Sequence, residues 1–244
     1  MTRIDVLSDV GGVTFTFDKG KRKEIWVREA GAAVRDVLEG SNINDKVSGL
    51  TENQYTEESE RGDYCDEFLE YAHQVARHVS VDVTDPSFVE QAGKQVLKGM
   101  LLDPTPTALL EYLQGEALES GELTAQRVPG IKRLMDYVLS TGGVFQGYST
   151  GAPKMPDQFH QAIGLDALVG NVKTTFPGHK AKERSAEQIL EMADTLYQNS
   201  GEKYNAFIDD NDNEARIWAS AREKLQQRDQ GSPTVYLLKK DLPK

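Results

Sequence analysis

The sequence predicts an α/β protein with a mostly parallel sheet and an inserted all-helical segment. Residues from about 20 to 120 show helical patterns with no strand between them. The rest of the chain alternates short apolar runs with amphipathic stretches, which is typical of strand–helix–strand units. We therefore expect an α/β core formed by residues 1–15 and 122–244, with a helical domain at 16–121.

The first apolar run, residues 4–10, leads into an acid and two glycines. Its apolar residues are typical of a buried strand, and Gly11 and Gly12 allow the backbone to turn sharply and to approach a ligand closely. Asp9 is therefore expected at the carboxyl end of a strand, where open α/β sheets bind their ligands. Because Asp and Gly are also ordinary turn residues, this segment alone does not establish a site.

Amphipathic stretches predict the helices of the inserted domain. Apolar residues recur there at helical spacing, and Thr84-Asp85-Pro86 combines a capping side chain with proline at a first helical position. The segment 41–63 is polar and acidic with few apolar residues, so we expect a loop there. The predicted helices lie at residues 23–38, 68–79, 86–102 and 107–118.

Strands and helices alternate again after Pro129. Helices are expected at residues 131–139, 184–197 and 214–227, and strands at 144–148, 167–172, 204–208 and 234–238. This alternation favours a parallel sheet. Polar side chains follow two of the predicted strands: Ser149 and Thr150 after the first, and the acidic cluster Asp209–Asp212 after the third.

Composition argues against several classes of protein. The chain has 244 residues, 39 of them acidic and 28 basic, for a formal charge of −11. No basic stripe stands out that would neutralise a phosphate backbone, so nucleic acid is not an expected partner. The single cysteine, Cys65, excludes an intramolecular disulfide and a cysteine-based zinc site. Neither a signal-peptide core nor a run of about 18 apolar residues is present, and we expect a cytoplasmic protein that does not bind membranes.

Four groups of residues carry the candidate chemistry: Asp9, the segment Ser149-Thr150-Gly151, the pair His179-Lys180, and the cluster Asp209–Asp212. Each has an ordinary explanation when it is taken singly. In this order and spacing, however, they resemble the four motifs of the haloacid dehalogenase (HAD) superfamily. Within it the chain is most similar to the enolase-phosphatase of methionine salvage. That likeness extends over residues 121–218 and is weak in the helical segment.

The resemblance implies a Rossmann-like, doubly wound core with a helical cap, and a Mg²⁺-dependent hydrolase. By resemblance, Asp9 and Asp210 supply carboxylates to the ion, and Gly11 supplies its backbone carbonyl. Asp9 is also the expected nucleophile, because an aspartate can form a covalent phosphoenzyme. Its attack on a phosphate brings two anions together, so a bound cation has to offset their repulsion.

The other matching positions are expected to bind the phosphate group. Lys180 is the expected fixed cation, since a nearby positive charge keeps a carboxylate ionised. Ser149 or Thr150 would donate hydrogen bonds to phosphate oxygens, together with backbone N–H groups around Gly151. His179 is expected to orient the substrate.

One residue departs from the family pattern. Phosphatases of this superfamily carry an acid two residues after the nucleophile, where this chain has Gly11. General acid–base assistance is worth roughly 10²–10⁴-fold in rate. Because the metal ligand at this position is a backbone carbonyl, the change should spare Mg²⁺ binding and slow the turnover of substrates with poor leaving groups.

Three accounts of the function therefore stay open. The chain is a phosphatase of a small phosphorylated metabolite, such as the diketo phosphate of methionine salvage, with a good leaving group or with an acid from Asp212, Glu214 or the helical domain. Alternatively, it hydrolyses a carbon–halogen or carbon–phosphorus bond, or it is a binding or regulatory protein with impaired catalysis. The sequence does not determine the oligomeric state.

A serine-hydrolase reading also fits one segment. Residues 147–151 match the Gly-x-Ser-x-Gly nucleophile elbow. That fold needs a histidine late in the chain, and only His160 and His179 follow Ser149. Pro153 and Pro156 are also expected to interrupt the helix that should come next. We therefore discount this alternative.

Overall fold

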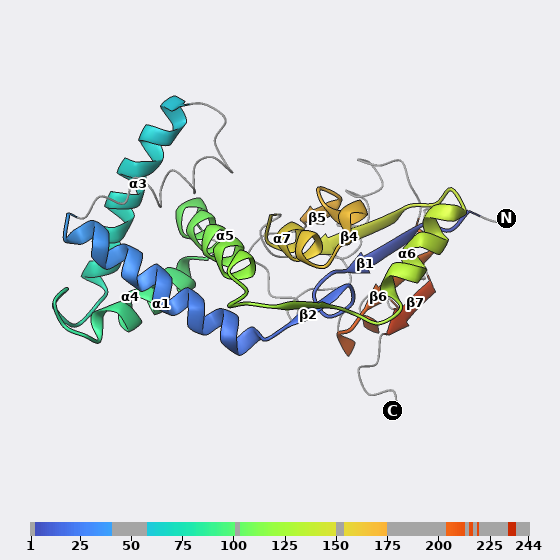
Figure 1. The fold of residues 1–244 in the computed structure, drawn as a ribbon, viewed down its shortest axis with the longest axis horizontal. Helices are drawn as coiled ribbons and strands as arrows, with labels where there is room; N and C mark the ends of the chain where they lie inside the picture. Colours follow the sequence, from blue (N-terminus) through green and yellow to red (C-terminus); the bar gives the residue numbers. More distant parts are fainter. Residues whose placement is uncertain are drawn as a thin grey trace. The chain divides into compact units, whose positions relative to one another are not determined.

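The structure of the chain is a computed structural model (Figure 1). By their internal contacts the residues divide into two compact units: a core unit of residues 1–17 and 125–244, and a helical unit of residues 18–124. The sequence analysis placed the boundaries after residues 15 and 121. The structure describes residues 3–40, 58–100, 103–149, 154–174, 204–212, 215–216, 219 and 234–237.

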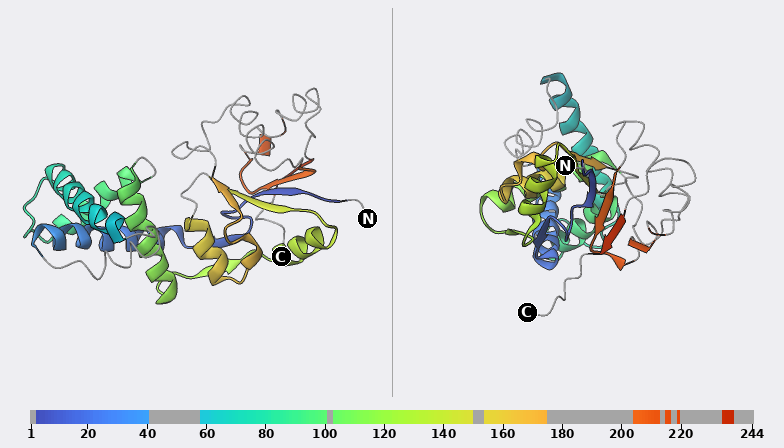
Figure 2. Two further views of the ribbon diagram at one scale, coloured as in Figure 1. Left: turned by 90° about the horizontal axis from the view of Figure 1, so that it is seen from above. Right: turned by 90° about the vertical axis from the view of Figure 1, so that its right-hand side faces the viewer.

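The core unit is built on a five-stranded sheet in the order β5-β4-β1-β6-β7. Its strands are β1 (Val6–Asp9), β4 (Phe145–Ser149), β5 (Val172–Thr174), β6 (Ala206–Asp209) and β7 (Thr234–Leu237). All neighbouring strands pair in parallel, which confirms the predicted parallel sheet. Figure 2 shows the strands fanned across the sheet, with β1 between β4 and β6. β1 is therefore the central strand.

Helix α6 (Ile131–Ser140) packs its apolar face on this sheet. Its residues Ile131, Met135 and Val138 recur at helical spacing and are buried, which explains why the pattern predicted the helix correctly. They share one cluster with Val6, Phe145 and Ile208 of the strands. A doubly wound sheet needs further helices. The segment 184–197 lies outside the described residues, and of the segment 214–227 only residues 215, 216 and 219 are described. That arrangement stays a prediction.

A second, antiparallel pair of strands joins β2 (Phe15–Phe17) to β3 (Ala125–Arg127). The rings of Phe15 and Phe17 both stack on Phe159 of helix α7 (Lys154–Ala162), with centroids 4.6 Å apart in each case. These contacts fix α7 beside β2. The loop between β1 and β2 consequently lies next to α7.

The helical unit contains α1 (Lys19–Leu38), α3 (Glu58–Arg77), α4 (Phe88–Gly99) and α5 (Pro104–Glu119). Helices α1 and α4 approach each other at glycines. A Cβ on Gly31 would lie 1.8 Å from the Val89 carbonyl oxygen, and one on Gly93 would lie 1.9 Å from that of Val27. Only glycine permits so close a contact. None of the helices in the described part of the chain is long and apolar enough to cross a membrane.

Several sequence predictions need correction. The strand expected at 167–172 is wrong: Asp166–Leu168 is a turn of 3-10 helix, and positive φ at Gly170 (70°) turns the chain before β5 begins. Pro156 does not interrupt a helix, because it lies in the first turn of α7, where proline's missing N–H is not needed. Strands β2 and β3 were not predicted, since three residues are too few to show a period.

Helix starts also differ from expectation. Helix α1 begins at Lys19, and α3 begins at Glu58, so its first turns replace the end of the loop expected at 41–63. The Asp85 side chain accepts hydrogen bonds from the N–H and Oγ of Ser87 at 2.8 and 2.7 Å, so it closes a turn, and α4 begins at Phe88. Helix α5 begins earlier than predicted, at Pro104. Its N-cap Asp103 accepts a bond of 2.9 Å from the Thr105 N–H, a cap followed by proline that the sequence analysis overlooked.

Candidate functional site

The strand ends that carry the predicted site residues meet at one edge of the sheet. Asp9 ends β1, Ser149 ends β4 and Asp209 ends β6. In the strand register, Asp9 lies opposite Tyr148 on one side, and Ser8 lies opposite Ile208 on the other. Since parallel strands end at the same edge, residues far apart in the sequence are brought together there.

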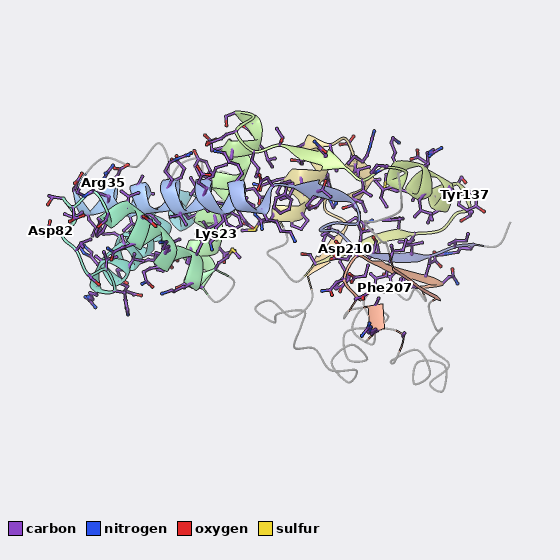
Figure 3. All side chains as sticks on the ribbon, turned by 90° about the horizontal axis from the view of Figure 1, so that it is seen from below. Lys23, Arg35, Asp82, Tyr137, Phe207 and Asp210 are labelled. Carbon is purple, nitrogen blue, oxygen red and sulfur yellow. The ribbon has the colours of Figure 1, made fainter. Side chains whose placement is uncertain are left out.

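Three carboxylates converge at this edge. Asp9, Asp209 and Asp210 each offer one oxygen, and these oxygens all lie within 4.8 Å of one another. Asp209 is 1% exposed, whereas Asp9 and Asp210 are half-buried. The backbone N–H of Asn211 donates a 2.7 Å hydrogen bond to Asp209 Oδ1, which holds that carboxylate in its turn. Asp210 is labelled at this end of the sheet in Figure 3.

The donor set of this acid cluster, defined as Asp9, Asp209 and Asp210, fits a hard divalent cation. Two unit charges 4 Å apart repel each other by about 4 kcal/mol at an effective dielectric constant near 20. A cation between the carboxylates converts this repulsion into attraction. All the offered atoms are carboxylate oxygens, the ligands that Mg²⁺ takes together with water and substrate oxygens. The cluster can therefore hold Mg²⁺.

The loop after β1 packs directly on the cluster through Gly12. This residue has a φ of 95°, and a Cβ built on it would lie 2.2 Å from Asp210 Oδ2. Glycine is therefore required both for the turn and for the close approach of the backbone to the carboxylate. Gly11 differs, because a Cβ there would meet no atom of the described residues within 4 Å. Crowding by the described residues thus does not impose the absence of an acid at Gly11.

The structure brings together some of the predicted site residues. Asp9 and Asp210 meet in the cluster, Gly11 lies two residues beyond Asp9 in the same loop, and Ser149 is half-buried at the end of the neighbouring strand. The remaining predicted residues lie outside the described part of the chain: Thr150, Gly151, His179 and Lys180.

Sequence analysis did not assign Asp209 a role of its own. It noted the residue only as part of an acidic run, whereas the structure buries its side chain and places it in the cluster. The sequence nevertheless contains a pattern that indicates Asp209 as a candidate. Asp209 follows the apolar pair Phe207-Ile208 directly, so it occupies the strand end, the position that made Asp9 a candidate.

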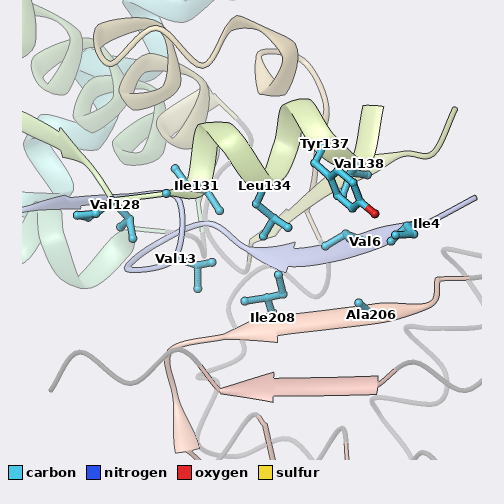
Figure 4. A pocket seen from close by; sticks show the side chains of 12 residues that line it. Ile4, Val6, Val13, Val128, Ile131, Leu134, Tyr137, Val138, Ala206 and Ile208 are labelled. Carbon is cyan, nitrogen blue, oxygen red and sulfur yellow. The ribbon is translucent and has the colours of Figure 1, made fainter. Parts of the chain in front are cut away.

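An apolar hollow of about 420 Å³ lies elsewhere in the core unit, between α6 and the strands β1 and β6 (Figure 4). The described residues that line it include Val6, Leu134 and Ile208 and no carboxylate. This described lining offers no group suited to phosphate or metal chemistry. The acid cluster is the better candidate for a reactive site.

Comparison with known proteins finds similarity at the level of structure. No family model matches the chain, and no curated protein matches it. Among solved structures, the crystal structure of the UTR4 protein (unknown transcript 4 protein) of Saccharomyces cerevisiae is similar, with 16% sequence identity and a TM-score of 0.48. The similarity covers 98% of this chain and 91% of that chain.

Proposed function

We propose that this chain is a HAD-like hydrolase that uses Asp9 as its nucleophile and Mg²⁺ as its cofactor to hydrolyse a small phosphorylated metabolite. One observation carries the proposal: Asp9 shares the carboxyl edge of the central strand with the carboxylates of Asp209 and Asp210, all within 4.8 Å. The order of the four sequence motifs supports it. Like-charged groups are gathered in this way at sites that bind a cation or a charged reactant.

In this proposal the chain's own residues perform a two-step displacement. A carboxylate oxygen of Asp9 attacks phosphorus, and the bond from phosphorus to the leaving oxygen breaks. This gives an aspartyl-phosphate and an alkoxide or enolate, which takes a proton from water. Water then attacks the same phosphorus, and inorganic phosphate leaves as the Asp9 carboxylate reforms. Bound Mg²⁺ would supply charge neutralisation for the approaching anions. Asp209 and Asp210 would hold it, with the Gly11 carbonyl as a further ligand.

Gly11 limits which phosphoesters this site would hydrolyse quickly. With no acid there to protonate the leaving oxygen, good leaving groups such as enolates should be favoured. Asp212, a substitute acid considered from the sequence, is exposed and lies 3.7 Å from Arg216. It is not a member of the acid cluster. The proposed substrate class is therefore an enol phosphate or another ester with a stable leaving group.

Phosphate release from a panel of esters tests this function. The panel contains nitrophenyl phosphate, an enol phosphate and an alkyl phosphate, each assayed with and without Mg²⁺. The wild type is compared with Asp9→Asn, and Asp136→Asn serves as the matched control because Asp136 is exposed and pairs with Lys132. We expect Mg²⁺-dependent release that falls at least about 10³-fold in Asp9→Asn and is unchanged in the control. Full activity in Asp9→Asn would remove it as the nucleophile.

Gly11 also favours a second candidate, a binding or regulatory protein that retains the cluster without efficient turnover. Binding and release assays on the same protein preparation distinguish a binding protein from a hydrolase. Binding of Mg²⁺ and of a phosphate analogue without release from any ester would favour this second role, or cleavage of another bond type. A parallel assay of halide release and of phosphonate cleavage separates those two outcomes.

A further inference from the structure

The loop between β1 and β2 is held closed by its own hydrogen bonds. The Val10 carbonyl oxygen accepts from the Thr14 N–H at 3.0 Å and from Thr14 Oγ1 at 2.8 Å. The Gly12 N–H donates to the Phe15 carbonyl at 2.8 Å. Val10 and Thr14 are both buried. The residues that follow Asp9 therefore form a compact turn whose position depends on Thr14.

A buried histidine contacts this turn from outside. His160 of α7 is fully buried, and its Nε2 lies 3.0 Å from Thr14 Oγ1. The Thr14 hydroxyl already gives its proton to Val10, so we assign the proton of the second contact to His160, as an Nε2–H donating to Thr14 Oγ1. The Phe15 ring lies edge-on to the imidazole, with centroids 5.4 Å apart. The histidine thus joins α7 to the turn.

This contact is not needed to satisfy the hydroxyl of Thr14. That group keeps its bond to Val10 with or without the histidine. Moreover, His160 Nδ1 is buried with no hydrogen-bond partner in the described part of the chain, and a buried unpaired polar atom costs stability. An apolar side chain of similar size would avoid that cost. Burial lowers the pKa of His160 to about 4, so the ring is neutral and keeps this single donor at pH 7.

The turn adjoins the acid cluster at two points. Asp9 immediately precedes it, and Gly12 packs so closely on Asp210 that a Cβ would lie 2.2 Å from Oδ2. A displacement of the turn would therefore change the separation between the Asp9 and Asp210 carboxylates. Groups that orient metal ligands in this indirect way strongly affect metal affinity.

We propose that His160 is a positioning residue for the acid cluster: its N–H fixes the Thr14 hydroxyl on the Val10 carbonyl and thereby sets where the turn after Asp9 lies against Asp210. The proposal rests on the proposed function, because its consequence is measured as Mg²⁺ affinity. It adds a residue of α7, remote in sequence, to the determinants of that site.

Two pairs of variants at this contact separate positioning from packing. His160→Phe keeps a buried ring but loses the N–H, and His160→Gln keeps an N–H donor. Thr14→Val keeps the shape of the side chain but loses the hydroxyl, and Thr14→Ser keeps the hydroxyl. Circular dichroism at the assay temperature confirms that each protein is folded, and the Thr14 pair serves as an independent test if His160→Phe fails to fold.

Amide hydrogen exchange without metal reports directly on the turn. We expect faster exchange at the Gly12 and Thr14 amides in His160→Phe and Thr14→Val, with near wild-type protection in His160→Gln and Thr14→Ser. Unchanged protection in His160→Phe and Thr14→Val would overturn the proposal, whatever the metal does.

Calorimetric titration with Mg²⁺ alone measures the consequence for the cluster. We expect affinity to fall about tenfold in His160→Phe and in Thr14→Val, and to stay within about twofold of wild type in the two conservative variants. The double variant should bind no more weakly than either single one, because both changes break the same contact. Loss of protection with unchanged Mg²⁺ affinity would overturn the positioning role alone. Absence of Mg²⁺ binding in the wild type would overturn the proposed metal site, and this proposal with it.

Discussion

β1 carries an aspartate near each end, and the two have opposite surroundings. Asp5, just before the strand, is buried among donors: its carboxylate accepts from Arg3 Nε at 2.9 Å and from the Val144 N–H at 2.9 Å. Asp9, at the carboxyl end, shares its place with the carboxylates of Asp209 and Asp210. The first arrangement stabilises the fold, and the second gathers carboxylates that the proposed Mg²⁺ would bind.

The comparison shows that residue type and burial do not identify a functional acid. Both aspartates belong to the same central segment, and both are at least half-buried. The groups that face them distinguish the two: donors at the amino end and other acids at the carboxyl end. Substitutions at the two ends should therefore affect different measurements.

The largest expected effect is a gain in the rate of phosphate release from a substitution at the carboxyl end of β1. Gly11→Asp introduces the missing acid at a position where a Cβ meets no described atom within 4 Å. If this carboxyl protonates the leaving oxygen, release of phosphate from the alkyl ester should rise by roughly 10²–10⁴-fold, with a smaller gain for nitrophenyl phosphate. The ratio of the two rates is the measurement. An equal change for both esters would contradict an acid–base role at this position.

The stability of the protein should also depend on pH through His160, which contacts the turn after the carboxyl end of β1. Burial lowers its pKa to about 4 in the folded protein, below its value of about 6.5 in the unfolded chain. Between these values the unfolded chain binds the proton and the folded one does not, so stability is lost as the pH falls from about 6.5 to 4, by up to roughly 3 kcal/mol. Urea unfolding at pH 7.5 and 4.5 measures this loss.

His160→Gln is the control for this pH effect. The variant lacks the buried imidazole, so the difference in unfolding free energy between it and the wild type should shrink or reverse at pH 4.5. Carboxyl groups titrate in both proteins and cancel in that difference. A difference that stays the same at both pH values would show that His160 is not buried in its neutral form.

At the amino end, Asp5→Ala should lower stability without changing catalysis. It removes the partner of Arg3 and leaves the Val144 N–H without its acceptor, at a cost of about 2 kcal/mol. Denaturant unfolding measures the cost, and Asp5→Asn, which keeps an acceptor for Val144, should lose less. Phosphate release per folded molecule should match the wild type. A selective loss of activity would break the distinction between the two ends.

The smallest effects are expected for alanine substitutions at the two glycines of the turn. Gly12→Ala places a Cβ at positive φ and against Asp210, so it should cost about 1–2 kcal/mol and weaken Mg²⁺ binding. Gly11→Ala meets no neighbouring atom and should be close to neutral in both measurements. Thermal melts and calorimetry of the pair provide the test. Equal effects at both positions would show that Asp210 does not depend on this close approach.

Much of the fold could be predicted because its elements have clear local patterns. The apolar spacing of residues 131–139 predicted α6, and the apolar run at 204–208 predicted β6, since burial on one face leaves a period in the sequence. Short or turn-controlled elements could not be predicted in this way. β2 has three residues, and the chain reversal at Gly170 depends on a positive φ that an apolar run does not reveal.

The residues around the candidate site also differ in whether the sequence could predict them. Asp9 and Asp210 could be singled out because each follows a strand, and parallel strands end together. The contact between Thr14 and His160 could not, because the two residues lie 146 positions apart and neither belongs to a recognisable motif. Contacts of this kind depend on how α7 packs beside β2, which only tertiary structure determines.

Because β1 is the central strand of the sheet, it has to wait during synthesis for partner strands that are made later. β1 is synthesised before the strands it pairs with, and the bond from the Asp5 N–H to Asn205 Oδ1 spans 200 residues. At about 5–20 residues per second, the strand waits roughly 10–40 s for that partner. The helical unit, residues 18–124, is continuous in sequence and is complete well within that interval. One edge of β1 can pair once β4 is made, but the other edge has no partner until β6 is made. An unpaired strand edge is prone to aggregation during that interval.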